Sequence, residues 1–179
     1  MTATTVISGV DTAALGAFIA STQNKADYSG TPFSANVVWQ GGFRNEIQVR
    51  DLAPQYADEP ASLGGTDIAS NPVEQILGAF GACLSIGYTA GAIGRGITLH
   101  ALELALTGRI DLPVFFGLKD GHAGFSDIDI VVRIDSDGSP EAIEALHEAV
   151  LRTSPVGNTL ERPVTLNVRL EQVATAVAA

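Results

Sequence analysis

The sequence predicts an α+β domain in which antiparallel strands pack on a long central helix. Three observations predict this class. Residues 71–96 form one long, nearly uncharged segment with helix signals at both ends. Alternating apolar residues mark strands on both sides of it, and the joins between successive strands are hairpin-like. The resulting order is helix, two strands, helix, two strands, helix, strand.

The central helix has capping residues at both of its predicted ends. Asn71 is a good N-cap, Pro72 suits the first helical position, and Glu74 completes a capping box. Gly96 is a suitable C-terminal stop. The interior holds five glycines and no charge between residues 76 and 94. Glycine disfavours helix, so close packing must compensate. We expect a core helix buried on all sides and no membrane span.

Four elements are predicted around the Gly41-Gly42 turn. A first helix follows Asp11 or Thr12. Alternation over residues 33–39 predicts a strand, the two glycines turn the chain, and a returning strand runs over residues 47–51. Residues 53–70 contain prolines and glycines without apolar periodicity, which predicts a long loop.

The second half of the chain alternates strands with a further helix. Strands are predicted over residues 99–110 and 125–134, with an irregular segment at 113–125 between them. Ser139 and Pro140 begin a helix that Pro155 ends. Alternating apolar residues over 163–173 predict a last strand.

Composition limits the possible partners. The chain has 179 residues, 46% of them hydrophobic and 17% charged, which predicts one globular domain over 1–179 with residues 1–30 as an N-terminal helical extension. A net charge of −10 argues against nucleic acid and anionic membranes as partners. The N-terminus lacks a basic region, so we expect no signal peptide and a cytoplasmic protein.

Cys83 is the only cysteine, and it lies in the central helix. A single cysteine excludes an intrachain disulfide and a cysteine-based zinc cluster. The three histidines are not at metal-ligand spacing, and no nucleotide-binding motif occurs, so neither a metal nor a cofactor is expected. Residues at helical spacing around Cys83 are apolar. The thiol is therefore either a buried hydrophobe or a reactive group in an apolar pocket. Glu74 lies about 180° around the helix from it.

Several short motifs resemble the OsmC/Ohr family, named for osmotically inducible protein C and organic hydroperoxide resistance protein. They are Trp39-x-Gly-Gly-x-Arg44, Asp58-Glu-Pro60, Leu63-Gly-Gly65, Asn71-Pro-Val-Glu74 running to Gly81-Ala-Cys83, and Ser154-Pro-Val156. The resemblance spans residues 33–170. It implies an α+β fold assembled as an intertwined homodimer, with sites at the interface.

The resemblance also implies a thiol chemistry. Active family members reduce organic hydroperoxides with a helix cysteine, supported by an arginine from the Gly-Gly turn, a glutamate at the helix start and a second cysteine that resolves the oxidised thiol. Cys83 matches the reacting cysteine and Arg44 the arginine, with Arg50 on the following strand as a further cation. Two positions depart from the pattern. Val73 occupies the glutamate position, with Glu74 displaced by one, and Ser154 occupies the position of the second cysteine.

Two hypotheses follow. The first is a divergent family member that lacks the resolving cysteine and acts as a one-cysteine thiol peroxidase. Cys83 and Arg44 are then catalytic, Glu74, Ser154 and Arg50 are possible supporting residues, and an external thiol is the reductant. The second is a non-catalytic dimer of the same fold that binds a small apolar or electrophilic ligand.

Overall fold

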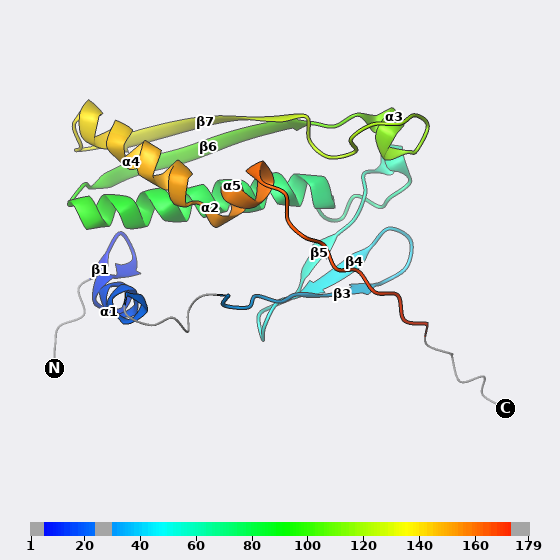
Figure 1. The fold of residues 1–179 in the computed structure, drawn as a ribbon, viewed down its shortest axis with the longest axis horizontal. Helices are drawn as coiled ribbons and strands as arrows, with labels where there is room; N and C mark the ends of the chain where they lie inside the picture. Colours follow the sequence, from blue (N-terminus) through cyan, green and yellow to red (C-terminus); the bar gives the residue numbers. More distant parts are fainter. Residues whose placement is uncertain (1–5, 24–29, 173–179) are drawn as a thin grey trace.

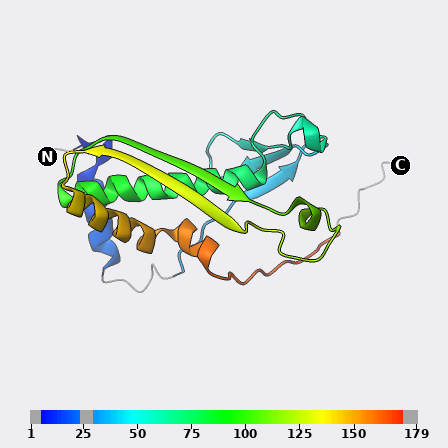
Figure 2. The ribbon, with the colours of Figure 1, turned by 90° about the horizontal axis from the view of Figure 1, so that it is seen from above.

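The computed structural model describes residues 6–23 and 30–172. Its centre is helix α2 (Pro72–Arg95), and a long antiparallel hairpin of β6 (Leu99–Arg109) and β7 (Asp127–Ser136) lies over it (Figures 1 and 2). Helix α4 (Pro140–Thr153) and the short α5 (Pro155–Glu161) run along one side of α2 (Figure 2). The fold class is therefore α+β, as predicted.

The predicted caps of α2 are confirmed. The Asn71 side chain accepts a hydrogen bond from the Glu74 backbone N–H at 2.8 Å, and the Glu74 carboxylate accepts one from the Asn71 N–H at 2.9 Å. Gly96 ends the helix in the left-handed region, with φ of 68°. Asp11 likewise caps α1 (Thr12–Thr22) by accepting from the Ala14 N–H at 2.9 Å.

The core lies where α2, α4 and the hairpin meet. It is formed by apolar side chains from all of these elements, among them Leu84, Tyr88, Ala92, Leu146 and Val150. The glycines of α2 allow side chains of α4 to approach the α2 backbone closely, as the glycine content of the helix predicts. A Cβ at Gly91 would lie 2.5 Å from Leu146 Cδ1, and one at Gly87 would lie 3.0 Å from Val150 Cγ1.

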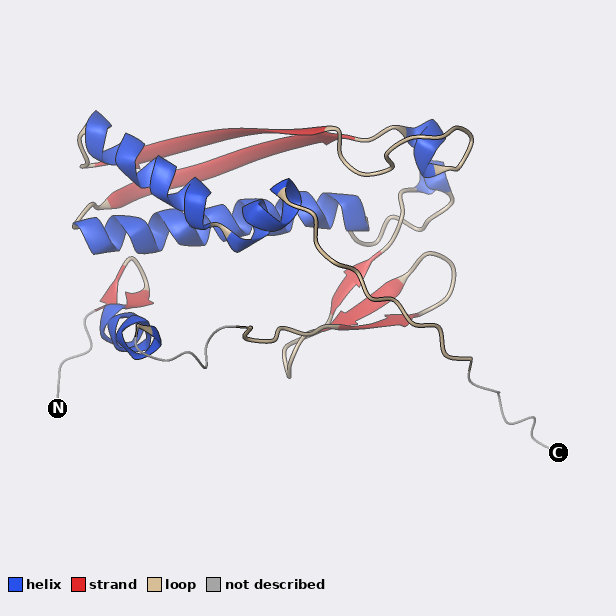
Figure 3. Ribbon diagram, in the orientation of Figure 1, coloured by secondary structure: helices blue, strands red, loops and turns tan. Residues whose placement is uncertain are grey.

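Two further groups of strands lie on the side of α2 away from the hairpin (Figures 1 and 3). One is the two-stranded pair of β1 (Val6–Ile7) and β2 (Val10–Asp11), which leads into α1. The other is a three-stranded antiparallel sheet in the order β3-β4-β5, formed by β3 (Asn36–Trp39), β4 (Asn45–Gln48) and β5 (Gln55–Ala57).

Two predictions about exposure and pairing are wrong for the single chain. First, α2 is not buried on all sides: its face toward β6 and α4 is buried, whereas Ile86 is 70% exposed. Second, residues 163–172 form no strand, because a strand needs hydrogen-bonding partners and the described part of the chain supplies none there. The alternating side chains of this segment are 56–92% exposed (Val164, Leu166, Val168 and Leu170).

Smaller departures concern short elements. The predicted loop at 53–70 contains β5 and a 3₁₀ turn at Ala61–Leu63, and the irregular segment contains the one-turn helix α3 (Leu112–Phe115). Pro155 separates α4 from α5 and begins α5, a helix that was not predicted. Elements of three to seven residues carry too few periodic positions to be recognised from the sequence.

By length and composition alone, α2 could also cross a membrane. The apolar core helix of a soluble protein meets the same criterion. In this chain, the Leu84, Tyr88 and Ala92 side chains pack against the chain's own strands and helices.

Candidate active site

Cys83 lies halfway along α2, on the side that faces the junction between α4 and α5. A cavity of about 430 Å³ opens at this point. Helical spacing predicts six neighbours of the thiol, and three of them, Ala79, Ile86 and Gly87, line this cavity. The other three do not: two line a second cavity instead (Ile76 and Phe80), and one lines neither (Ala90). The full lining of the Cys83 cavity is Ala79, Ala82, Cys83, Ile86, Gly87, Val150, Thr153, Ser154 and Pro155. The thiol is therefore partly accessible in an almost wholly apolar setting.

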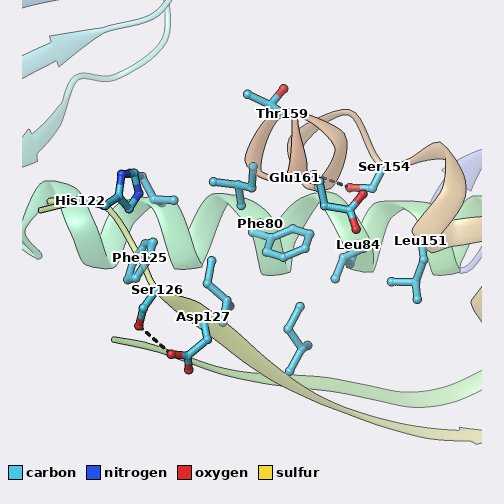
Figure 4. Close-up of a pocket in the computed structure, with 16 residues that line it drawn as sticks. Phe80, Leu84, His122, Phe125, Ser126, Asp127, Leu151, Ser154, Thr159 and Glu161 are labelled. Atoms are coloured by element: carbon cyan, nitrogen blue, oxygen red, sulfur yellow. Dashed lines mark hydrogen bonds between the residues drawn. The ribbon is translucent and has the colours of Figure 1, made fainter. Parts of the chain in front are cut away.

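The Ser154 side chain is in hydrogen-bonding contact with the thiol. Its Oγ lies 3.3 Å from Cys83 Sγ, and the serine is only 5% exposed. The same oxygen caps α5 by accepting the Gly157 backbone N–H at 3.0 Å (dashed in Figure 4). Because Gly157 is the donor in that bond, the Ser154 hydroxyl hydrogen remains available for the sulfur. A donor in this position stabilises a thiolate or the oxygen of an oxidised sulfur.

Local sequence explains why Ser154 is held so firmly. Ser154 takes the extended conformation that an N-cap needs, and Pro155 fits the first position of α5. The Ser154 carbonyl also accepts a hydrogen bond from Asn158 Nδ2 at 2.8 Å. The hydroxyl is thus positioned by a cap before any ligand arrives.

A larger cavity of about 620 Å³ lies between α2, α5 and β7, and Ser154 lines this one as well (Figure 4). Its floor is apolar, with Phe80 and Leu84 from α2 and Ile130 from β7. Polar groups occur at its edge, from His122, Asp127 and Glu161. This cavity could not be predicted from the sequence, because its walls come from segments far apart in the chain.

Arg44 lies at the β3–β4 turn, which Gly41 and Gly42 make possible with φ values of 96° and 58°. The turn is closed by a hydrogen bond from the Gln40 N–H to the Arg44 carbonyl at 2.8 Å. Arg44 does not line the Cys83 cavity of its own chain, and neither does Arg50, just beyond β4, or Glu74. Within residues 6–23 and 30–172, neither Arg44 nor Arg50 forms an ion pair.

The sequence of residues 64–169 matches the family model described as OsmC-like protein. This match covers more than half of the chain. The chain belongs to the OsmC-like family.

Solved structures of the same fold agree with this assignment. An OsmC-like protein from Mycoplasma pneumoniae is 21% identical, with a TM-score of 0.64, and the match covers 74% of this chain and 89% of that one. An organic hydroperoxide resistance protein OsmC from Legionella pneumophila is 19% identical, with a TM-score of 0.53 and coverage of 73% and 90%. A putative organic hydroperoxide resistance protein from Vibrio cholerae, with captopril bound in one of its active sites, is 17% identical, with a TM-score of 0.52 and coverage of 76% and 90%. No curated protein sequence matches the chain.

Two of the remaining OsmC-like motifs, Asp58-Glu-Pro60 and Leu63-Gly-Gly65, lie in the loop that precedes α2. Asp58, only 1% exposed, accepts hydrogen bonds from the Glu59 N–H, the Thr66 N–H and the Thr66 hydroxyl. These bonds, the Thr66 hydroxyl first, hold the pKa of Asp58 below its usual value. Gly65 is needed because a Cβ there would lie 1.7 Å from the Glu59 carbonyl oxygen. The Asp-Glu-Pro and Leu-Gly-Gly motifs therefore form one folded loop.

A polar contact between α2 and α4, formed by the buried Tyr88 and the half-buried His147, was not predicted from the sequence. The Tyr88 hydroxyl hydrogen-bonds His147 Nδ1, so that α2 is joined to α4 inside the core. Burial raises the pKa of Tyr88, and the nearby Glu144 charge adds to that effect. Among the described residues, no cluster of three or more His, Cys, Asp or Glu could hold a metal ion.

Proposed function

We propose that this chain is a one-cysteine thiol peroxidase that reduces organic hydroperoxides. The observation that carries the proposal is the contact between Cys83 Sγ and Ser154 Oγ at 3.3 Å in an apolar cavity. Ser154 stands where the family resemblance expects the second cysteine, so the contact has the arrangement of a cysteine pair with one sulfur replaced by oxygen. Apolar walls suit the organic part of a hydroperoxide.

The reaction has two stages. The Cys83 thiolate attacks the terminal peroxide oxygen, the O–O bond breaks, and the alkoxide leaves as an alcohol after taking a proton. Cys83 becomes a sulfenic acid, whose oxygen can accept the Ser154 hydroxyl hydrogen. Because Ser154 cannot form a disulfide, an external thiol attacks the sulfenic sulfur and releases water. A second thiol then frees Cys83 from the mixed disulfide and leaves the reductant oxidised.

A second copy of the chain is part of the proposal. The chain exposes 13404 Å² of accessible surface, whereas a compact monomer of 18.5 kDa exposes about 8,000 Å². A chain with more exposed surface than a compact monomer is expected when its apolar strands pack against a second copy. Exposed Ile86 lies at the Cys83 cavity, so a partner on this face of α2 would help to enclose the site.

Arg44 has its role in that dimer. It lies on a sheet outside the packed core and does not line the Cys83 cavity of its own chain. We infer that the β3–β4 turn of one subunit brings Arg44 to the thiol of the other, where its permanent charge stabilises the thiolate. Cytoplasmic thiols are the expected source of reducing equivalents.

The direct test is consumption of an organic hydroperoxide with a panel of monothiol and dithiol reductants. Wild type should turn over, and Cys83→Ser should not. One equivalent of hydroperoxide without reductant should leave a sulfenic acid that dimedone traps by mass spectrometry. In Ser154→Cys the same treatment should give an intramolecular disulfide between positions 83 and 154. Consumption no faster than in Cys83→Ser with every reductant would refute the peroxidase.

The second candidate is a non-catalytic dimer that binds a small apolar or electrophilic ligand. The observation favouring it is the almost wholly apolar lining of the Cys83 cavity, together with Val73 at the family's glutamate position. The rate of Cys83 alkylation at neutral pH separates the two candidates. A rate no higher than that of an unactivated thiol supports the binding protein.

A further inference from the structure

The larger cavity has the size and lining of a small-molecule site. Its volume of about 620 Å³ falls within the range of about 300–1,000 Å³ that ligand pockets occupy. Eight of its sixteen lining residues are aliphatic or aromatic. The apolar lining residues are Ile76, Phe80, Leu84, Phe125, Ile128, Ile130, Leu151 and Leu160.

The charges at the edge of this cavity are all of one sign. Asp127 and Glu161 line it, together with His122, and no lysine or arginine does. Asp127 is largely compensated, because Arg109 forms an ion pair with it and the Ser126 hydroxyl donates to it at 2.7 Å. Glu161 is different, since in the described part of the chain it has no ion pair. Its carboxylate, at the end of α5, is turned toward the cavity in Figure 4.

We propose that this cavity binds an apolar small molecule whose polar end is uncharged or cationic, and that Glu161 excludes carboxylates. An anionic ligand would place its charge beside the Glu161 carboxylate, which is exposed at the edge of the cavity, and the two like charges would repel each other. An alcohol or an amine meets no such repulsion. The site is distinct from the thiol cavity, because Cys83 does not line it, although Ser154 contributes to both.

Binding to this cavity can be measured without any redox reaction. The neutral fluorescent probe N-phenyl-1-naphthylamine is bound to the full-length chain and displaced by decan-1-ol, decylamine or decanoate. We expect the alcohol and the amine to displace the probe at concentrations at least tenfold lower than decanoate. In Glu161→Gln, the difference between decanoate and decanol should shrink to threefold or less. In the matched control Glu148→Gln, at an exposed residue of α4 that does not line the cavity, this difference should stay within twofold of the wild-type value.

A second pair of variants locates the probe. Ile76 and Leu118 are both exposed aliphatic residues, but only Ile76 lines this cavity, and Leu118 lines neither this one nor the thiol cavity. Ile76→Trp should weaken probe binding at least fivefold, and Leu118→Trp should change it less than twofold. The proposal is overturned if the probe does not bind saturably, if Ile76→Trp binds it as wild type does, or if decanoate competes as well as decanol. Because none of these readouts needs the thiol, the result is independent of peroxidase activity.

Discussion

The two sides of α2 differ in how completely a single chain buries the apolar residues found there. On one side, the hairpin and α4 bury Leu84, Tyr88 and Leu146 completely. On the other side, the β3–β5 sheet and the segment 163–172 carry strand-like sequences whose apolar residues stay exposed, for example Trp39 at 70% and Val168 at 92%. The packed side is stabilised within one chain. The open side carries apolar residues of the kind that proteins normally bury, but the described residues of a single chain leave them exposed. For this reason the proposed function includes a second copy of the chain.

The largest expected contrast is between two residues of α2 that lie two positions apart. Leu84→Ala creates a cavity in the core and should lower the free energy of unfolding by about 3 kcal/mol. Ile86→Ala, on the open side, should lower the free energy of unfolding only by weakening the dimer. Its effect on the urea midpoint should therefore vary with protein concentration. Urea denaturation at two protein concentrations measures both. Equal, concentration-independent losses would show that the two sides are not different.

The second prediction concerns the arginines of the open side. Arg44→Ala should slow alkylation of Cys83 by iodoacetamide at neutral pH about tenfold, because a nearby permanent cation favours the thiolate. Arg50→Ala is the matched control and should change the rate less than twofold. Equal rates in wild type and both variants would remove Arg44 from the site.

An effect of similar size is expected inside the packed side. Tyr88→Phe loses the hydrogen bond to His147 and should cost about 1.5 kcal/mol at pH 7. Because burial raises the pKa of Tyr88 in the folded chain, the stability from keeping this tyrosine neutral is complete below the unfolded pKa of about 10. It is then lost as pH rises toward the folded value. The difference between wild type and Tyr88→Phe should therefore shrink above pH 10, which denaturation curves at several pH values will show.

The smallest effect belongs to the helix cap. Asn71→Ala should cost about 1 kcal/mol of stability. It should leave the Cys83 alkylation rate nearly unchanged, because the capping box does not line the thiol cavity. A large change in that rate with intact stability would place the start of α2 in the site.

The features that could be predicted from the sequence are those that depend on residues close together in the chain. Caps such as Asn71 and Asp11 are local, so α2 and α1 begin where expected. Cys83 was found because it is the only cysteine, and the match of Ser154 to a second cysteine came from the family resemblance. The larger cavity and the Tyr88–His147 bond were not predictable, because they depend on how distant segments meet. Apolar residues alternate in the segment 163–173 as in a strand. A strand forms only beside a hydrogen-bonding partner strand, however, and the alternation does not show whether the chain supplies one.

The central claim is that the open side of α2 is covered by a second copy. Sedimentation equilibrium of the full chain at micromolar concentration tests it most directly. The account predicts one species with twice the mass of the 18.5 kDa chain. A single monomeric species at that concentration would contradict it.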